Sequence, residues 1–311
     1  MRILVTGVAG FVGSHVAERL LSDGHDVIGL DGFTDYYPRP IKERNLAPVL
    51  EHSGFTFHEL DLRRDPLGPA VDGVEAVIHE AAMPGLPRSW SDVEAYLDCN
   101  VLGVARLLEA CRSAGIRRFL QASTSSVYGL EAVGDETMPL RPISPYGVTK
   151  LAAEHLIQAH VATFGFPAVF VRYFSIYGPR QRPDMAYHRF IEAMLEGLPI
   201  TLFGDGEQTR SNTFISDAVE GTLAALDGGR IGEVYNIGGG ESLTVSQAIA
   251  TIAEVLGVEP IIQRAEAQPG DQRRTGADTS RAERTFGYRP TVGAREGLRR
   301  QVDWHRGLRT G

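Results

Sequence analysis

Tyr146 and Lys150 form the residue pair whose chemistry is most specific in this sequence. They are spaced as YxxxK, and Lys150 is one of only two lysines among 31 basic residues. In a helix, residues four apart lie on one face, so an ammonium would stand beside the phenol. A free phenol has a pKa near ~10, and lowering it to about 7 requires roughly 4 kcal/mol of differential interaction. A phenol in such an environment could act as a general base.

A run of hydroxyl side chains follows another predicted strand. Residues 123–126 are Ser-Thr-Ser-Ser, after a strand predicted at 119–122. In an open α/β sheet, ligands bind at the carboxyl ends of the strands. A Ser/Thr-rich turn with local backbone hydrogen bonds is the alternative. The YxxxK pair favours the substrate-site interpretation.

Three glycines near the N-terminus indicate a phosphate-binding turn. Gly7, Gly10 and Gly13 follow a predicted strand at 2–6 and open an apolar-periodic helix that Gly24 ends. Glycine permits the tight turn and lets backbone N–H groups approach a pyrophosphate at the helix N-terminus, where the helix dipole favours anions. Because strand–turn–helix context surrounds the glycines, we predict a dinucleotide site.

Two aspartates end the next predicted strands. Asp31 follows the strand at 26–30, where a carboxylate can bind both adenosine ribose hydroxyls and would repel a 2′-phosphate. This favours NAD over NADP, and the positive nicotinamide of NAD⁺ would help to ionise Tyr146. Asp61 follows the strand at 55–59, and its side chain could reach the adenine amine.

The alternation of strands and helices predicts an α/β fold built on a doubly wound parallel sheet. Further loops, at 180–185 and 203–209, indicate a smaller, partly interleaved C-terminal lobe, and residues 241–311 are expected to be helix and loop. The remaining predicted elements are strands at 76–79, 168–173 and 234–237, and helices at about 93–114 and 145–164.

Composition excludes several classes of protein. The 31 basic and 39 acidic residues give a net charge of −8, which disfavours nucleic-acid binding. The sequence contains no run of 18 apolar residues, so no membrane span is expected. Cys99 and Cys111 form no disulfide framework, and no Cys/His spacing suggests a metal site, so we expect no metal and a cytoplasmic location.

Taken together, these residues resemble the extended short-chain dehydrogenase/reductase family, especially its nucleotide-sugar epimerases. The resemblance implies a Rossmann fold, a tightly held NAD and a homodimer. The matching segments run in order through nearly the whole chain and include VTGVAGFVGSHVAERLL, HEAAMPG, ASTSSVYG, PYGVTK, RYFSIYGPRQRPDM, FGDGEQTRSNTFISD and GDQRRTGADTSRAERTFGYRP.

By this resemblance Thr124, Tyr146 and Lys150 take the catalytic positions, and Asn100 supports the active site. Residues 1–175, with a returning strand near 233–237, would bind NAD, and 176–311 would mainly bind a UDP-sugar. The predicted cofactor-binding residues are Gly7, Gly10, Phe11, Val12, Gly13, Asp31, Asp61, Leu62, Ala81, Asn100, Tyr146, Lys150 and Tyr173.

The residues after Thr124 indicate which of the family's reactions this chain is expected to catalyse. Family members that eliminate water carry an Asp-Glu pair there, and decarboxylating members carry Glu two positions after the threonine. This chain has Ser125 and Ser126 instead. Without a general acid or base at these positions, simple epimerisation by tyrosine and NAD is favoured.

Two stretches, at 34–44 and 177–186, look like the UDP-glucuronate 4-epimerases in particular. That group usually has Thr where this chain has Ser175, and Leu is common where this chain has Glu80. Small neutral hydroxyls can bind a sugar carboxylate without like-charge repulsion, a task assigned to Ser123, Ser125 and Ser175.

Arginines are expected to bind the UDP diphosphate, because planar guanidinium groups bind phosphate oxygens bidentately. Arg210 and Arg273 match family positions that face it; Arg182 is a third candidate and Arg189 a fourth, although most arginines must be solvated. Phe203 either packs near the uracil or belongs to the core.

We therefore predict a UDP-glucuronate 4-epimerase that interconverts UDP-glucuronate and UDP-galacturonate. The alternatives are a UDP-glucose or UDP-N-acetylhexosamine 4-epimerase, a UDP-glucuronate decarboxylase, and a non-catalytic NAD-binding scaffold. The predicted helices at 93–114 and 145–164 fit either a helical bundle between subunits or packing within one chain.

Overall fold

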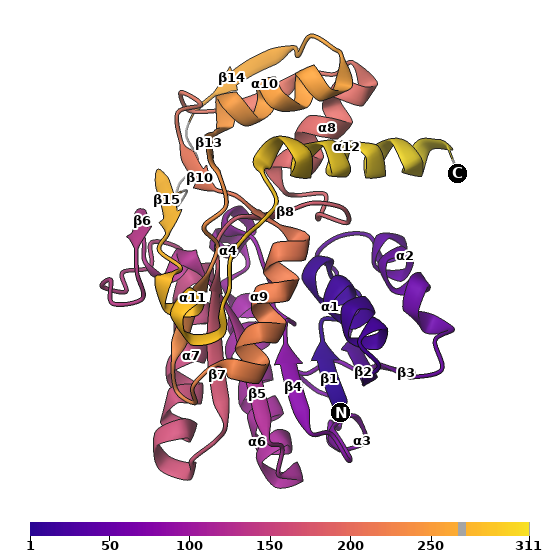
Figure 1. Ribbon diagram of the computed structural model, residues 1–311, viewed down its shortest axis with the longest axis vertical. Coiled ribbons are helices and arrows are strands. Elements are labelled where there is room, and N and C mark those ends of the chain that lie inside the picture. The colour runs from indigo at the N-terminus through magenta and orange to yellow at the C-terminus, as the bar shows by residue number, and fades with distance from the viewer. Residues whose placement is uncertain (267–271, 311) are drawn as a thin grey trace.

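A seven-stranded parallel sheet organises the larger lobe of the molecule (Figure 1). The computed structural model describes residues 1–266 and 272–310. The strand order is β12-β7-β5-β4-β1-β2-β3, which confirms the predicted doubly wound α/β fold. The strands are β1 (Arg2–Thr6), β2 (Asp26–Asp31), β3 (Phe55–Glu59), β4 (Ala76–His79), β5 (Arg118–Thr124), β7 (Ala168–Tyr173) and β12 (Val234–Ile237).

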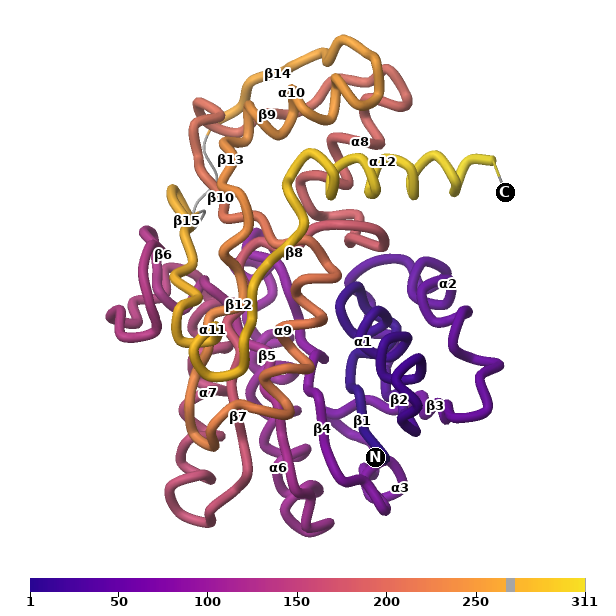
Figure 2. The backbone as a smooth tube through the Cα atoms, viewed as in Figure 1, coloured from indigo at the N-terminus to yellow at the C-terminus, as the bar shows by residue number. Residues whose placement is uncertain are grey.

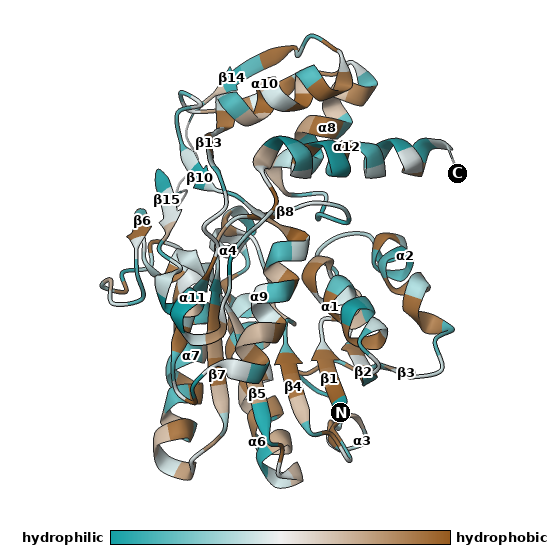
Figure 3. Ribbon diagram, in the orientation of Figure 1, coloured by the Kyte–Doolittle hydropathy of each residue, from teal (hydrophilic) through white to brown (hydrophobic). Residues whose placement is uncertain are grey.

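Helices cover both faces of this sheet, which explains the nearly continuous apolar runs of its strands (Figure 3). Ile3 and Val5 belong to one core and Leu4 to the other, because side chains alternate along a strand. The first core contains α1 (Phe11–Ser22), α2 (Arg39–Leu50) and α9 (Ile215–Gly228); the second contains α3 (Gly68–Val71), α6 (Gly103–Ala114) and α7 (Pro145–Phe164).

The smaller lobe lies beyond the carboxyl edge of the sheet (Figure 2). Its buried residues, such as Phe190, Ile249 and Leu298, belong to the same core as Ile3 and Val5, so the two lobes share apolar packing. Its helices are α8 (Ala186–Glu196), α10 (Val245–Leu256) and α12 (Ala294–Thr310), and its parallel strand pair is β9 (Ile200–Phe203) with β14 (Ile262–Ala265).

The lobes exchange segments in both directions. The strand β12 returns to the main sheet, as predicted, while β6 (Glu131–Gly134) leaves the first half of the chain to pair with β15 (Arg274–Ala277). The short strands that complete this second layer are β13 (Ser242–Thr244) and β10 (Thr209–Ser211), and a separate pair joins β8 (Ile176–Tyr177) to β11 (Thr213–Phe214).

The expectation that residues 241–311 are only helix and loop is therefore wrong. Three strands, β13, β14 and β15, arise there because each is hydrogen-bonded to a partner distant in sequence. Such short strands have little local hydrophobic pattern, and pairing decides their conformation.

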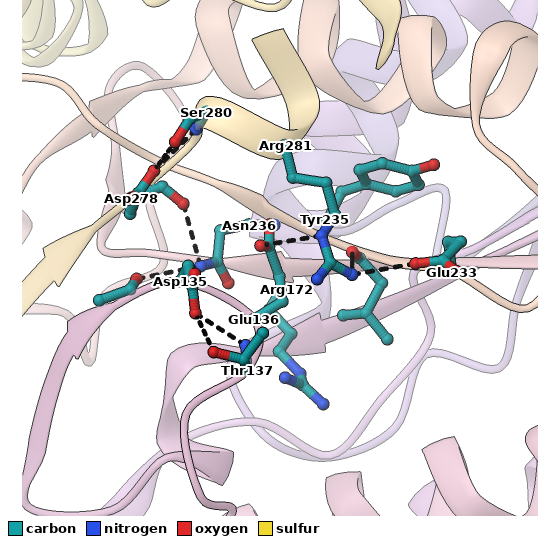
Figure 4. A network of polar contacts seen from close by, with 12 residues as sticks. Asp135, Glu136, Thr137, Arg172, Glu233, Tyr235, Asn236, Asp278, Ser280 and Arg281 are labelled. Carbon is teal, nitrogen blue, oxygen red and sulfur yellow. Dashed lines mark hydrogen bonds and ion pairs between the residues drawn. The ribbon is translucent and has the colours of Figure 1, made fainter. Parts of the chain in front are cut away.

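A polar network holds the exchanged segments together (Figure 4). The backbone N–H of Asn236 on β12 donates to Glu136 Oε1 at 2.7 Å, and its side-chain amide donates to the carbonyls of Gly134 and Asp278. Arg281, on α11 (Ser280–Phe286), pairs with Glu136 at 3.3 Å and with Glu233 at 2.9 Å. The network joins the β6 turn, β12 and α11.

The structure confirms the predicted helix at 93–114 and adds a π-helical turn within it. It is divided into α5 (Val93–Leu97), a π-helical turn (Asp98–Leu102) and α6, and a short helix, α4 (Leu86–Ser91), precedes it. A π turn widens the helix by one residue and is frequent at functional sites. Here it carries Asn100, whose contacts are described below.

Candidate active site

A cleft of about 420 Å³ opens at the carboxyl edge of the main sheet, between the two lobes. Its walls include the residues that follow β1, β2, β4, β5 and β7, together with the loop around Arg182. The strand order reverses between β1 and β4, which is where open α/β sheets bind their ligands.

The glycine turn forms one wall of the cleft and leaves no room for side chains. A Cβ on Gly13 would lie 2.3 Å from the Gly7 carbonyl oxygen, and one on Gly7 would lie 2.8 Å from the Ala81 Cα. Gly7 also has φ +69°, which favours glycine. The N-cap of α1 is Gly10, which has no side chain to cap the helix, so the N–H groups of its first turn are available to an anion in the cleft.

Asp31 lies at the end of β2, almost buried at the cleft wall. Its carboxylate accepts hydrogen bonds from the backbone N–H groups of Ala9 (3.1 Å) and Phe33 (2.8 Å). Burial raises the pKa of Asp31, while Lys42 and these two N–H groups act against the rise. The remaining acceptor positions of this carboxylate suit a ligand diol.

Asp61 lines the same part of the cleft but is already engaged. Arg63 donates to both of its carboxylate oxygens at 2.7–3.1 Å. Burial acts to raise the pKa of the Asp61 carboxyl, but the hydrogen bonds with Arg63 outweigh this effect, and the pKa is lowered. Arg63 also lines the cleft.

Tyr146 and Lys150 project from the first turns of α7. Ser144 caps this helix, since its hydroxyl accepts from the Gly147 N–H at 3.1 Å. Lys150 Nζ donates to the Ala122 carbonyl at 2.7 Å, and burial lowers its pKa to about 8. This arrangement fixes the ammonium one helical turn from the phenol.

The protein alone does not lower the pKa of Tyr146. Burial raises it, whereas a hydrogen bond with Thr124 and the charge of Arg182 lower it in part. The pKa near 7 that the sequence suggested therefore requires a further positive charge in the cleft.

The hydroxyls at the end of β5 and directly after it have distinct partners. The Ser123 hydroxyl donates to the buried carboxylate of Glu154. Thr124 donates to Ser126 Oγ at 3.2 Å, and Ser125 donates to Gln272 at 3.2 Å. All four serine and threonine residues line the cleft.

Comparison with known proteins agrees with this geometry. A family model described as the NAD dependent epimerase/dehydratase family matches residues 3–238. This chain belongs to that family.

Three relatives illustrate the similarity. An uncharacterized UDP-glucose epimerase of Bacillus subtilis (strain 168) is 43% identical over 307 residues, covering 97% of each chain. A UDP-glucuronate 4-epimerase of Thermodesulfobacterium geofontis is 36% identical over 308 residues, covering 97% of this chain and 95% of the relative. The crystal structure of the Bacillus cereus UDP-glucuronic acid 4-epimerase with UDP-glucuronic acid and NAD superposes with a TM-score of 0.97, at 41% identity, covering 99% of this chain and all of the other.

Most residues predicted from the epimerase family pattern line the cleft, and four do not. Arg189 and Arg273 are exposed, Phe203 is the last residue of β9, and Asn100 is buried; none of these four residues lines the cleft. The predicted residues that line it are Gly7, Gly10, Phe11, Val12, Gly13, Asp31, Asp61, Leu62, Ala81, Ser123, Thr124, Ser125, Tyr146, Lys150, Tyr173, Ser175, Arg182 and Arg210.

Asn100 acts on the cleft through its neighbours. Its side chain bonds the backbone of Met83 twice, at 2.7 and 3.0 Å, and donates to Thr149 at 3.1 Å. Thr149 lies between Tyr146 and Lys150 on α7. The π turn thus ties the segment after β4 to the helix of the YxxxK pair.

Ser175 adopts an uncommon backbone conformation for a residue other than glycine. Its φ is +30°, and it lies between β7 and β8 on the cleft wall. Its carbonyl accepts from the Thr213 N–H at 3.2 Å, which helps to hold the turn. Residues in such conformations cluster at functional sites of enzymes.

Several residues that line the cleft were not among the site residues predicted from the sequence. Gln272, rather than Arg273, enters the cleft wall, donating to the carbonyls of Ser125 and Gly129. Glu80 lines the cleft too, and its departure from the family pattern was the available signal. Other residues of this kind are Tyr36, Tyr37, Lys42, Cys99 and Met185.

Arg182 lies near the catalytic end of the cleft. It donates to both oxygens of Asp184 at 3.0 Å, and Tyr36 donates to the same carboxylate at 3.2 Å. Its charge acts to lower the pKa of Tyr146, and Arg182 lines the cleft with that residue. Arg210 lines the cleft from β10.

Within the described ranges, one group of side chains has spacing suited to a metal ion. His188, Glu192 and His305 have ligand atoms within 4.8 Å of one another, but they lie outside the cleft lining. Glu192 is already bonded to His305 at 2.5 Å and to Arg309 at 2.8 Å, which accounts for the cluster as packing between α8 and α12.

In the part of the chain that the structure describes, no helix combines the length and the apolar character needed to cross a membrane.

Proposed function

We propose that this protein is a UDP-glucuronate 4-epimerase that interconverts UDP-glucuronate and UDP-galacturonate through a 4-keto sugar. The observation that carries the proposal is a cleft in which Tyr146 lies beside Thr124 and Arg182, with serines where dehydratases and decarboxylases carry acids. The similarity to relatives described as UDP-glucuronate 4-epimerases supports the same substrate.

The glycine turn, the uncapped start of α1 and Asp31 fit NAD, because they offer N–H groups to a pyrophosphate and a carboxylate to a ribose diol. When bound, NAD⁺ supplies the hydride acceptor for C4 and, as NADH, the donor that returns it. Its positive charge is also the one that Tyr146 requires for ionisation.

In this mechanism Tyr146 accepts the proton of the sugar 4-hydroxyl and later returns it. Lys150, one helical turn away, would stabilise the phenolate, and Thr124, which hydrogen-bonds Tyr146, would also hydrogen-bond the sugar O4. Arg210 binds the diphosphate, so the sugar can turn about its diphosphate bonds and present its other face. Arg182 lines the same cleft and acts to lower the pKa of Tyr146, and its role at the diphosphate stays a prediction. Holding the nucleotide while freeing the sugar uses binding energy where it aids catalysis.

Residues 1–175 and the returning β12 would bind NAD, and 176–311 would bind the UDP-sugar. Tyr173, Leu62 and Ala81 are proposed to contact the cofactor. Arg189, Phe203 and Arg273, which lie outside the cleft lining, stay predictions for the substrate.

The closest competing function is a neutral UDP-hexose 4-epimerase, which the name of the Bacillus subtilis relative favours. NMR of the purified protein with UDP-glucuronate, first without and then with added NAD, tests both. Formation of UDP-galacturonate supports the proposal, and a UDP-pentose would instead indicate decarboxylation. If UDP-glucuronate is unchanged, the same assay is repeated with UDP-glucose and UDP-N-acetylglucosamine. Inactivity on all three UDP-sugars would favour the non-catalytic NAD-binding scaffold.

Removing the proposed carboxylate contacts should divert the product. A 4-keto uronate loses CO₂ when its breaking bond aligns with the carbonyl π system, and a fixed carboxylate prevents this alignment. We expect the Ser125→Ala, Ser175→Ala variant to convert a larger share of UDP-glucuronate to UDP-pentose, measured by NMR. Ser126→Ala is the matched control, and an unchanged pentose share in the double variant would contradict the clamp.

We also infer that the protein is a cytoplasmic homodimer. Both cysteines are free thiols, in agreement with a reducing compartment. The α5–α6 segment and α7 leave large apolar side chains on the surface, a feature of interaction sites: Val93, Leu97, Leu102, Val148 and Phe164.

Charges on this surface should prevent dimerisation. We expect the Leu97→Glu, Leu102→Glu variant to have half the parent mass by light scattering, because two buried carboxylates per subunit oppose association. Leu198→Glu, an equally exposed leucine elsewhere, should leave the mass unchanged. A monomeric parent would contradict the homodimer.

A further inference from the structure

Glu80 is a carboxyl group that the proposed mechanism does not use. It directly follows β4 at the point where the strand order reverses, and it lines the cleft with Tyr146 and Lys150. A carboxyl group so far inside a cleft needs partners, because desolvation disfavours its charged form.

Its hydrogen-bond chain supports both protonation states. Glu80 Oε1 lies 2.6 Å from the Tyr173 hydroxyl, which lies 2.6 Å from Thr222 Oγ1, and Thr222 is 2.7 Å from the Ala218 carbonyl. If Glu80 is protonated, each hydroxyl donates to the next acceptor and the chain ends at Ala218. If Glu80 is ionised, Tyr173 donates to it instead. The chain therefore permits Glu80 to titrate without leaving a donor unpaired.

The charges nearby give this titration a consequence. Lys150 is buried and faces two carboxylates, Glu80 and Glu154. Glu154 is already paired with Arg172, which donates to both of its oxygens at 2.6–3.0 Å. Among the described residues, the printed hydrogen-bond partner of Glu80 is the neutral phenol of Tyr173, so the charge of Glu80 is left to balance the ammonium.

We propose that Glu80 is a positioning residue whose carboxylate keeps Lys150 protonated beside Tyr146. This inference rests on the proposed function, because it concerns the same tyrosine chemistry.

The direction of the pH effect follows from the groups that face one another. Burial raises the pKa of Glu80 to about 7, while Tyr173 and Lys150 oppose the rise. Glu80 therefore acquires its charge just below the range in which Lys150, with a pKa of about 8, would lose its proton. The other titratable or charged groups facing these residues are Arg182 toward Tyr146, Glu154 toward Lys150, and His79, whose pKa Lys150 helps to lower.

Replacing Glu80 with glutamine should lower two pKa values. Lys150 loses a stabilising carboxylate, and Tyr146 loses a charge that raises its own pKa. Both limbs of the pH–rate profile of Glu80→Gln should therefore move to lower pH. The rates of this variant and of the parent should differ most above pH 7.

The lysine content of this chain permits a direct test that needs no turnover. Protein labelled with ¹³C at the lysine ε-carbon and saturated with NAD should give two lysine signals, and Lys42→Arg assigns the one from Lys150. We expect Glu80→Gln to lower the titration midpoint of Lys150 by about 0.5 pH unit or more. An unchanged midpoint would overturn the proposal, even if the pH–rate profile changed.

Two further variants complete the experiment. Glu94→Gln removes an exposed glutamate and should leave the Lys150 midpoint unchanged. Glu80→Leu removes both the charge of Glu80 and its hydrogen bond to Tyr173, and it should lower the Lys150 midpoint as Glu80→Gln does. If Glu80→Gln is unstable, Glu80→Leu takes its place in the test. If no UDP-sugar is epimerised, the proposed function fails while the Lys150 titration still decides the role of Glu80.

Discussion

Replacing Tyr146 with phenylalanine is expected to lower kcat for UDP-glucuronate epimerisation by about 10³-fold, within the range of general acid–base catalysis. The ring should keep its place, because Tyr146 packs edge-on against Tyr96 with the ring centroids 6.3 Å apart. Only the proton-transferring hydroxyl is lost. Turnover measured by NMR, together with the affinity for UDP-glucuronate and NAD content, would separate catalysis from binding.

A matched control is Tyr288→Phe. Tyr288 is a buried tyrosine outside the cleft lining whose hydroxyl donates to the Gly238 carbonyl. This variant should retain parental kcat. A Tyr146→Phe protein with more than about a tenth of parental turnover would require another general base.

The second large effect concerns stability. Glu154→Gln is expected to lower the free energy of unfolding by about 3–5 kcal/mol, because it leaves the charge of Arg172 buried without its counter-ion. Both side chains are at most 3% exposed, and Arg172 also donates to the Tyr128 hydroxyl at 3.0 Å. Urea unfolding at fixed NAD concentration would measure the change.

Two comparisons make this prediction specific. Glu296→Gln breaks a solvent-exposed pair with Arg299 and should alter stability little. The Arg172→Met, Glu154→Leu variant removes both charges and should recover much of the loss. If the double variant loses as much free energy of unfolding as its two single variants together, the loss in Glu154→Gln does not come from the unpaired charge of Arg172.

The same pair explains why Ser123 is a poor candidate for holding substrate. Its hydroxyl proton is donated to Glu154, so Ser123 links the ion pair to the strand end that carries Thr124. We expect Glu154→Gln to disturb catalysis as well as stability. No local feature of the sequence identifies Glu154 as the acceptor, since the two residues lie 31 positions apart.

The sequence by itself predicted the seven main strands, the helix that carries Tyr146 and Lys150, and the glycine turn. These features depend on short-range rules: apolar runs in buried parallel strands, i,i+4 spacing on a helix, and the absence of a Cβ at Gly7 and Gly13. Each rule operates within a few neighbouring residues, so it can be applied before the fold is known.

Only the tertiary structure decided which distant residues meet. Gln272 contacts Ser125 across 147 positions, β6 pairs with β15 across a similar distance, and the π turn appears where Asn100 bonds Met83 and Thr149. Glu80 acquires its character from Tyr173 and Lys150, which come from other elements. Pairing and desolvation are properties of the assembled fold, and therefore no local pattern encodes them.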